Sequence, residues 1–118
     1  MIENEFTDSQ TLKRKLKENI ERIEGFEEKL GISLQNISVN VSKELDMITL
    51  IGEIIKTNPD INIDHFHIIS NFYNDCDEII YRDTESIYNF EGYDSFQIVI
   101  YDTDIIVNIN KIRIYVKG

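Results

Sequence analysis

The spacing of apolar residues changes once along this chain, near Gly31. Before Gly31 they recur at about the 3.6-residue repeat of an α-helix, whereas after it Ile, Val, Tyr and Phe alternate with polar residues in short runs. Because successive side chains of a strand point to opposite faces, the second pattern indicates β-structure. The sequence therefore predicts a mainly β fold preceded by one N-terminal amphipathic α-helix.

The predicted helix covers residues 7–30 and follows a frayed N-terminus at residues 1–6. Thr7 with Gln10 resembles a capping box at its start, and Gly31 stands where a left-handed cap is expected. The apolar side chains of the helix fall on one stripe, which we treat as the candidate interaction surface. The stripe consists of Leu12, Leu16, Ile20, Ile23, Phe26 and Leu30.

The order of charges along the predicted helix is unusual. Basic residues cluster near its start and acidic residues toward its end, which is the reverse of the order that the helix macrodipole favours. An antiparallel second copy would place each basic half beside an acidic half, which favours a homodimer through the stripe. The alternative is that the stripe packs on the chain's own β-domain and the charges are solvated. Both alternatives stay open at the level of sequence.

Residues 31–118 form the predicted β-domain. Turn signals divide this region into about six or seven strands, the pattern of an immunoglobulin-like antiparallel β-sandwich. A change of alternation at Gln35-Asn36 predicts a bulge, and the longest strand is expected at residues 61–73, with a final strand at residues 105–117. The residues predicted to fill the core are Ile54, Phe66, Ile68, Phe72, Phe96, Ile98 and Ile100.

Three local patterns between residues 51 and 100 resemble one known family. They are Ile51-Gly52-Glu53-Ile54; Phe66-x-Ile68-x-Ser70-x-Phe72-Tyr73-Asn74 with Ile79; and Gly92-x-x-x-Phe96-x-Ile98. This region is similar to the FxLYD domain, an immunoglobulin-like β-sandwich of bacterial and archaeal proteins. The resemblance covers less than half of the chain. It implies a fold and a binding module, with no shared catalytic residues to carry across.

The overall charge limits the kinds of partner that we expect. Asp and Glu number 22 against 12 Lys and Arg, which gives a net charge of −10. This charge disfavours nucleic acid and anionic membranes, and it favours either simple solubility or a protein partner with a basic surface. Cys76 is the only cysteine, so no intrachain disulfide can form. The acidic N-terminus is no secretory signal, which predicts a cytoplasmic protein if Met1 is the natural start.

The residues with potential for chemistry do not form a recognisable site. His65 and His67 share one face of a predicted strand, but no third metal ligand lies near them in the sequence. Cys76 has no basic neighbour to lower its pKa, and Tyr93 is expected at a surface or corner hydrogen bond. We therefore predict no catalytic residue, no cofactor and no tightly bound metal. The acidic groups weighed as weak calcium ligands are Asn74, Asp75, Asp77 and Glu78 in one turn, and Asp102 with Asp104 in another.

These observations leave two classes of function. The first is a non-catalytic protein-interaction module, which is the leading hypothesis. The second is an acidic inhibitor or immunity-type protein that blocks a basic nucleic-acid-binding surface by charge mimicry. Steep weakening of binding with ionic strength would favour the second, because mimicry of a phosphate backbone depends on charge alone.

Overall fold

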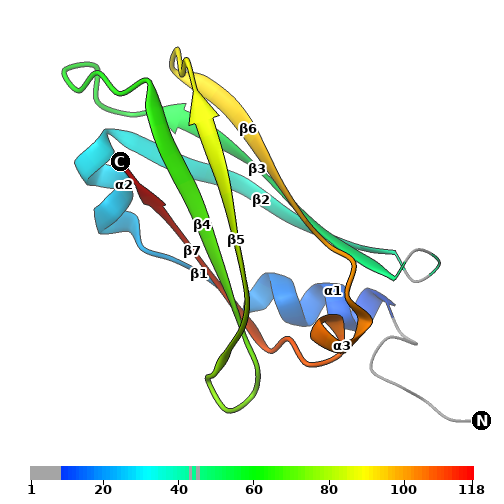
Figure 1. The fold of residues 1–118 in the computed structure, drawn as a ribbon. Helices are drawn as coiled ribbons and strands as arrows, with labels where there is room; N and C mark the ends of the chain where they lie inside the picture. The colour runs from blue at the N-terminus through cyan, green and yellow to red at the C-terminus, as the bar shows by residue number, and fades with distance from the viewer. Residues whose placement is uncertain (1–8, 43, 45) are drawn as a thin grey trace, which may run out of the picture.

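The computed structural model describes residues 9–42, 44 and 46–118, and these residues form seven strands in two packed sheets (Figure 1). This confirms the predicted β-sandwich. In sheet A the spatial order is β1 (Ile20–Arg22), β7 (Lys111–Lys117), β4 (His65–Tyr73) and β5 (Ile79–Tyr88). In sheet B the order is β2 (Ile32–Ser42), β3 (Met47–Lys56) and β6 (Tyr93–Ile100). All neighbouring strands are antiparallel except β1 and β7, which are parallel.

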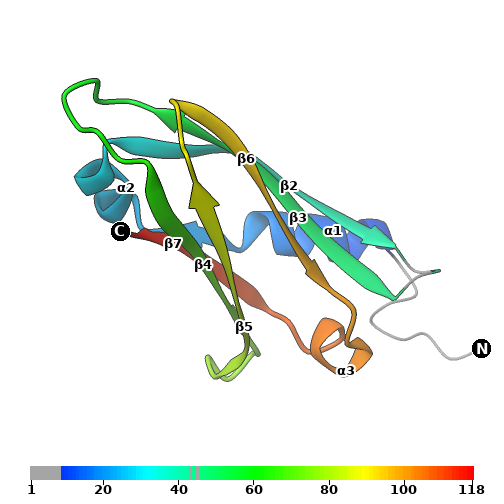
Figure 2. The same ribbon diagram turned by 45° about the horizontal axis from the view of Figure 1, so that its top comes forward.

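The hydrophobic core lies between the two sheets, which Figure 2 shows as separate layers. Each strand contributes its alternate residues to the core because side chains of a strand alternate between faces. The prediction of the core is confirmed, since all seven of its residues expose 2 % or less of their surface. The longest predicted strand begins later than expected, because β4 starts at His65 and the residues before it form a loop.

Sheet B contains one bulge and one close contact between a glycine and an aromatic ring. The pairing of β2 with β3 shifts register between Gln35 and Ser38, and Asn36 has a positive φ of 53°, so the predicted bulge is confirmed. On β3, Gly52 lies against the ring of Phe96, and a Cβ added to Gly52 would come within 2.5 Å of ring atoms. The glycine is therefore required by the close approach of a core aromatic ring to the backbone.

The prediction of one helix over residues 7–30 is wrong. The chain forms α1 (Ser9–Glu18), then β1, then α2 (Glu24–Leu30), and Figure 1 shows the two helices at opposite ends of the sandwich. Asn19 ends α1, because its N–H donates to the Leu16 carbonyl and its Nδ2 donates to the Lys15 carbonyl at 2.7 Å. The Ile112 N–H then donates to the Asn19 carbonyl, which starts the pairing of β1 with β7. The frayed N-terminus predicted for residues 1–6 and the cap at Thr7 lie outside the described residues.

The break between α1 and α2 also removes the conflict with the helix macrodipole. Lys15 and Lys17 lie in the last turn of α1, where cations are favourable. Glu24 and Glu27 lie in the first turn of α2, and its last turn carries Lys29. The charge order that was unfavourable for one long helix is favourable for two short ones. Gly31 caps α2 in the left-handed conformation, with φ 72° and ψ 30°, as predicted.

The apolar stripe of the predicted helix is divided among three elements. Leu12 and Leu16 are buried in this chain's own core, where α1 packs on β2, so they are not exposed to a second chain. The half-buried Ile20 begins β1, and Phe26 on α2 is 40 % exposed. The reading in which α1 packs on its own sandwich is therefore correct for the first half of the stripe. Self-association through the second half stays a prediction.

The end of the chain contains a second departure from the predicted strands. A short helix, α3 (Thr103–Ile106), occupies the start of the run predicted as one strand, and β7 begins only at Lys111. Oδ1 of Asp102 accepts hydrogen bonds from the N–H groups of Asp104 and Ile105, which caps α3. This carboxylate, weighed above as a calcium ligand, is thus used as a helix cap.

Candidate functional site

The outward-facing side of sheet A carries an unusual combination of side chains. In β7 the buried residues Ile112, Ile114 and Val116 alternate with residues that point away from the core. The register of β7 on β4 and of β4 on β5 brings the outward residues of these strands into adjacent rows. We call this surface the basic face, and it is made of Lys111, Arg113, Lys117, Arg82, His65, His67, Tyr73, Tyr88 and Tyr115.

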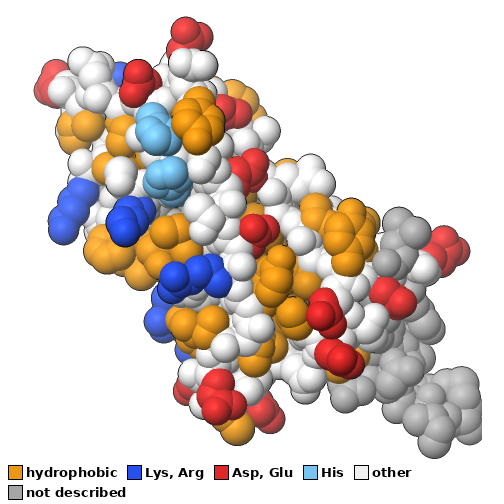
Figure 3. Space-filling view, viewed as in Figure 1, with side chains coloured by type: hydrophobic (Ala, Val, Ile, Leu, Met, Phe, Trp, Pro, Cys, Tyr) orange, Lys and Arg blue, Asp and Glu red, His pale blue; other side chains and the backbone are white. Residues whose placement is uncertain are grey.

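The basic face has the opposite charge to the protein as a whole. Among the outward-facing residues of the described strands of sheet A, Glu21 on β1 carries the single carboxylate. Figure 3 shows histidine, Lys and Arg side chains lying among hydrophobic ones over this sheet, with acidic side chains at the borders. Within a chain of net charge −10, cations and aromatic rings are thus concentrated on one face.

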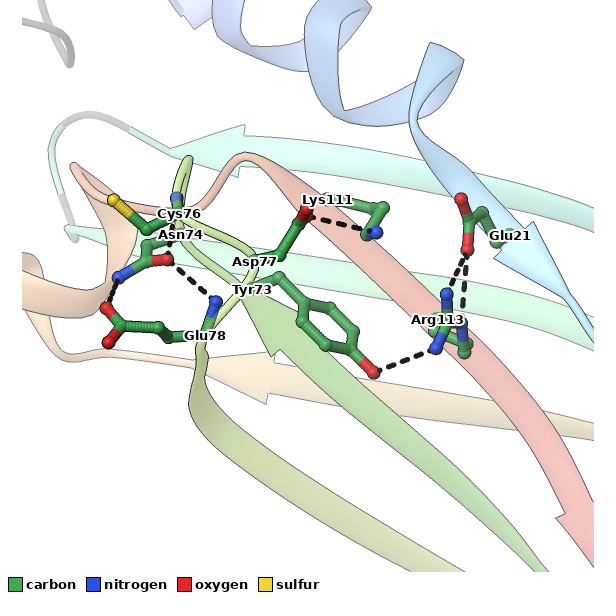
Figure 4. Close-up of polar contacts among 8 residues, drawn as sticks. All are labelled: Glu21, Tyr73, Asn74, Cys76, Asp77, Glu78, Lys111 and Arg113. Atoms are coloured by element: carbon green, nitrogen blue, oxygen red, sulfur yellow. Dashed lines mark hydrogen bonds and ion pairs between the residues drawn. The ribbon is translucent and has the colours of Figure 1, made fainter.

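Tyr73 lies at the centre of a charged cluster at one end of the basic face (Figure 4). Nζ of Lys111 lies 4.8 Å from the centre of the Tyr73 ring and Cζ of Arg113 lies 5.2 Å from it, which are cation–π distances. Nη1 of Arg113 donates to the Tyr73 hydroxyl at 3.2 Å, and Nη2 donates to Oε1 of Glu21 at 2.8 Å. The hydrogen bond with Glu21 is the main reason that the pKa of Arg113 is raised. The cluster holds Arg113 flat on the face.

The turn between β4 and β5 uses its oxygen atoms internally. Oδ1 of Asn74 accepts from the N–H groups of Cys76 and Glu78, and its Nδ2 donates to Glu78 (Figure 4). Asp77 forms an ion pair with Lys111 at 3.3 Å. Cys76 is exposed, and the pKa of its thiol is raised mainly by the neighbouring Asp75 carboxylate, which disfavours the thiolate. Of the four residues weighed here as calcium ligands, Asn74 and Glu78 are thus bonded within the turn and Asp77 is paired with β7.

The two histidines lie at the other end of the basic face and share that face, as predicted. The ring of His65 stacks on Tyr88 with 4.6 Å between centroids, and it meets the ring of His67 edge to face at 5.0 Å. Nδ1 of His67 is 2.8 Å from Oγ of Ser86. In the described part of the chain, no three His, Cys, Asp or Glu side chains converge as metal ligands. This end of the face is thus an exposed aromatic platform.

An apolar pocket of about 300 Å³ adjoins the basic face between α2 and the end of β7. Phe26 on α2 meets Tyr115 on β7 edge to face, with 6.0 Å between ring centroids. Nζ of Lys29 lies 5.7 Å from the Phe26 ring. Two of the predicted interaction residues, Phe26 and Leu30, therefore line this pocket, whereas the stripe as a whole does not form one surface. The lining consists of Phe26, Lys29, Leu30, Tyr115, Val116, Lys117 and Gly118.

The position of α2 beside β7 depends on a buried carboxylate. Glu27 is 2 % exposed, and its Oε1 accepts from the Leu34 N–H of β2 at 3.0 Å and from Nη2 of Arg22 at 2.7 Å. Nε of Arg22 donates to the other carboxylate oxygen at 3.2 Å, so the pair is bidentate. The hydrogen bond with Glu27 is the main reason that the pKa of Arg22 is raised. Glu27 thus ties α2 to β1 and β2 and fixes one wall of the pocket.

The sequence analysis missed the basic face, although part of its signal is local. In the run from Lys111 to Lys117, strict alternation puts Lys111, Arg113, Tyr115 and Lys117 on one side of a strand. The contribution of β5 is not local, because Arg82 reaches the face only through pairing with Asn71, to whose Oδ1 it donates at 2.8 Å. Only the sheet order makes the pattern visible.

Comparisons with known proteins find likeness of structure alone. No protein-family model matches this chain, and no curated protein is detectably related to it in sequence. A Campylobacter jejuni protein, cj0090, is similar in structure with a TM-score of 0.47 and 7% identity, covering 85% of this chain and 97% of that one. A DUF1425 family member from Shewanella sp. pv-4 is similar with a TM-score of 0.49 and 8% identity, covering 74% and 77%. Among the described residues, no helix is long and apolar enough to cross a membrane.

Proposed function

We propose that this protein is a non-catalytic protein-interaction module that binds an acidic partner protein through the basic face. One observation carries the proposal. In a chain of net charge −10, Arg82, Lys111, Arg113 and Lys117 gather on one sheet face with two histidines and three tyrosines, while Glu21 is the one carboxylate among the outward-facing described residues of that sheet. Arg and Tyr are the residues that most often supply binding energy at protein interfaces.

The aromatic rings support an interface rather than a solvated surface. Tyr88 is 63 % exposed, and its ring stacks on His65. The ring is therefore both held in place and accessible to a partner. Such a ring loses little conformational entropy on binding. Tyr73 is buried beneath Lys111 and Arg113, and its ring fixes the positions of these two cations on the face. The face therefore combines ordered aromatic anchors with positive charge.

A protein partner is favoured over nucleic acid because of the charge of the rest of the molecule. Basic faces with aromatic rings also bind single-stranded nucleic acid, where bases stack on the rings. A phosphate backbone carries charge along its whole length, so a net charge of −10 repels it at long range, whereas a protein partner can confine its acidic residues to the segment that meets the basic face. Binding of a single-stranded oligonucleotide in preference to an acidic peptide would contradict the proposal.

The family resemblance agrees with a binding module, whereas the net charge suggests a basic partner. The FxLYD resemblance supports a binding module, and the close packing of Gly52 on Phe96 fits the core positions that carry it. The basic partner and the inhibitor role rest on net charge alone, and no feature of the basic face favours them. A cytoplasmic location stays a prediction that cell fractionation can test.

The experiment measures the affinity for a short polyglutamate peptide as a charge probe. Arg82→Gln with Lys117→Gln removes two of the four cations of the basic face while keeping a donor for Asn71, and we expect binding to weaken on the order of tenfold. The matched control, Lys15→Gln with Lys17→Gln on α1, changes net charge equally and should leave affinity nearly unchanged. Equal loss in both variants would mean that the probe senses net charge and not the basic face.

A further inference from the structure

We propose that the pocket between α2 and β7 receives an apolar side chain from an acidic segment of the partner. This inference rests on the proposed function and names where and how the partner is anchored. Two of the predicted interaction residues, Phe26 and Leu30, line this pocket together.

The pocket is shaped to hold a side chain. Its volume of about 300 Å³ exceeds that of a single large apolar side chain, and Phe26, Leu30 and Tyr115 give it apolar walls. Phe26 remains 40 % exposed although it contacts Tyr115, so its ring is accessible from this side. Pockets of this kind supply the central anchor in many protein interfaces.

Charge identifies the kind of segment that fits. The lining of the pocket includes Lys29 and Lys117 and no Asp or Glu side chain. Lys117 belongs also to the basic face, so the two surfaces are continuous. A segment that inserts an apolar side chain here would have its flanking residues beside these lysines. Acidic flanking residues complement them, and this commits the proposal to an acidic segment with an apolar anchor.

The test uses two synthetic peptides made of Asp and Glu residues, one with a central Leu and one with Ser in its place. Calorimetric titration of the intact protein should give about tenfold tighter binding for the Leu peptide, as expected for burial of one apolar side chain. Phe26→Ala should remove this difference. The control Tyr101→Ala, which removes a ring that is 68 % exposed elsewhere, should keep it.

Equal affinity for the two peptides, or a difference that survives Phe26→Ala, would each overturn the pocket proposal.

The outcomes separate this inference from the proposed function. If both peptides bind equally and the Arg82→Gln, Lys117→Gln variant binds neither, the basic face is the binding site and the pocket proposal is wrong. If the Leu peptide binds the Arg82→Gln, Lys117→Gln variant normally but does not bind Phe26→Ala, the pocket is the binding site and the proposed role of the basic face is wrong. If the protein without peptide sediments as a dimer and Phe26→Ala sediments as a monomer, the pocket binds a second copy of this chain. That result would contradict the proposed acidic partner.

Discussion

The outward-facing sides of the two sheets differ although the sheets share one core. Sheet A presents the basic face, whose cations have few carboxylates beside them. On sheet B the outward residues of the described strands include one charged side chain, Glu53, and this carboxylate accepts hydrogen bonds from the Tyr93 hydroxyl and the Asn36 amide. The placement of Tyr93 at a surface hydrogen bond confirms the prediction from sequence. The one charge on sheet B is thus bonded within that sheet. On sheet A, Lys111 and Arg113 form ion pairs, whereas Arg82 and Lys117 take part in no ion pair among the described residues.

The difference between the two outer faces shows which positions of a β-sandwich can vary in side-chain type. Inner positions must be apolar to form the core, so the two sheets have similar residues at these positions. Outer positions carry no such requirement, and a concentration of cations there costs electrostatic repulsion that neutral residues would avoid. The three predictions that follow test the supports of each sheet, in order of decreasing effect.

The largest effect is expected beside sheet A, at the buried carboxylate that holds α2. Glu27→Ala removes the partner of Arg22 and of the Leu34 N–H, so we expect a loss of about 2–4 kcal/mol in the free energy of unfolding. Chemical denaturation measures this loss. The matched control is Glu28→Ala one residue further on, which is exposed and should change stability by less than about 0.5 kcal/mol. Similar values for both variants would show that Glu27 does not anchor α2.

A smaller loss is expected in sheet B, where the ring of Phe96 lies on Gly52. Gly52→Ala places a methyl group within 2.5 Å of that ring and should cost about 1–3 kcal/mol through overpacking. Gly25→Ala in α2 is the control, because no atom lies within 4 Å of its added Cβ. This control should stabilise the protein by about 0.5–1 kcal/mol, since alanine favours a helix. Thermal unfolding with equal midpoints for the two variants would contradict the packing described here.

The smallest effect concerns the titration of Glu53 on sheet B. Its pKa is lowered, first by the hydrogen bond from the Tyr93 hydroxyl and then by that from Asn36. A carboxylate with a lowered folded pKa adds stability above the ordinary pKa of Glu, and this stability is lost as the pH falls through the folded value. Tyr93→Phe should raise the pKa of Glu53 toward its ordinary range, as NMR titration of the side chain can measure. An unchanged pKa would mean that Tyr93 does not bind the carboxylate in solution.

The sequence predicted the inner residues well because their signal is local. Phe66, Ile68 and Phe72 alternate within one strand, so no knowledge of neighbouring strands was needed to place them in the core. The break after α1 was missed because Ile20 and Ile23 continue the helical spacing. In the structure Ile20 pairs with Ile112 of β7, far along the chain, and the Ile23 N–H donates to the Ile114 carbonyl. The charge order against the macrodipole was the available signal for that break, and we interpreted it as a sign of dimerisation.

The candidate site was less predictable because it also depends on pairing between strands that are distant in the sequence. His65 and His67 could be placed on one face from their spacing, but their neighbours Tyr88 and Ser86 come from another strand. The interaction residues were chosen as one helical stripe, and the fold sends Leu16 into the core. Functional surfaces of sheets combine strands whose order no single segment encodes.

The central claim is that the basic face of sheet A, and not sheet B, contacts the acidic partner. Amide chemical-shift mapping of the isotope-labelled protein with the polyglutamate peptide tests it directly. We predict shifts over β4, β5 and β7, with the largest near Tyr73, Arg113 and Lys117, and no shifts over β2 and β3. Shifts that centre on sheet B, or that spread evenly over both sheets, would contradict the claim.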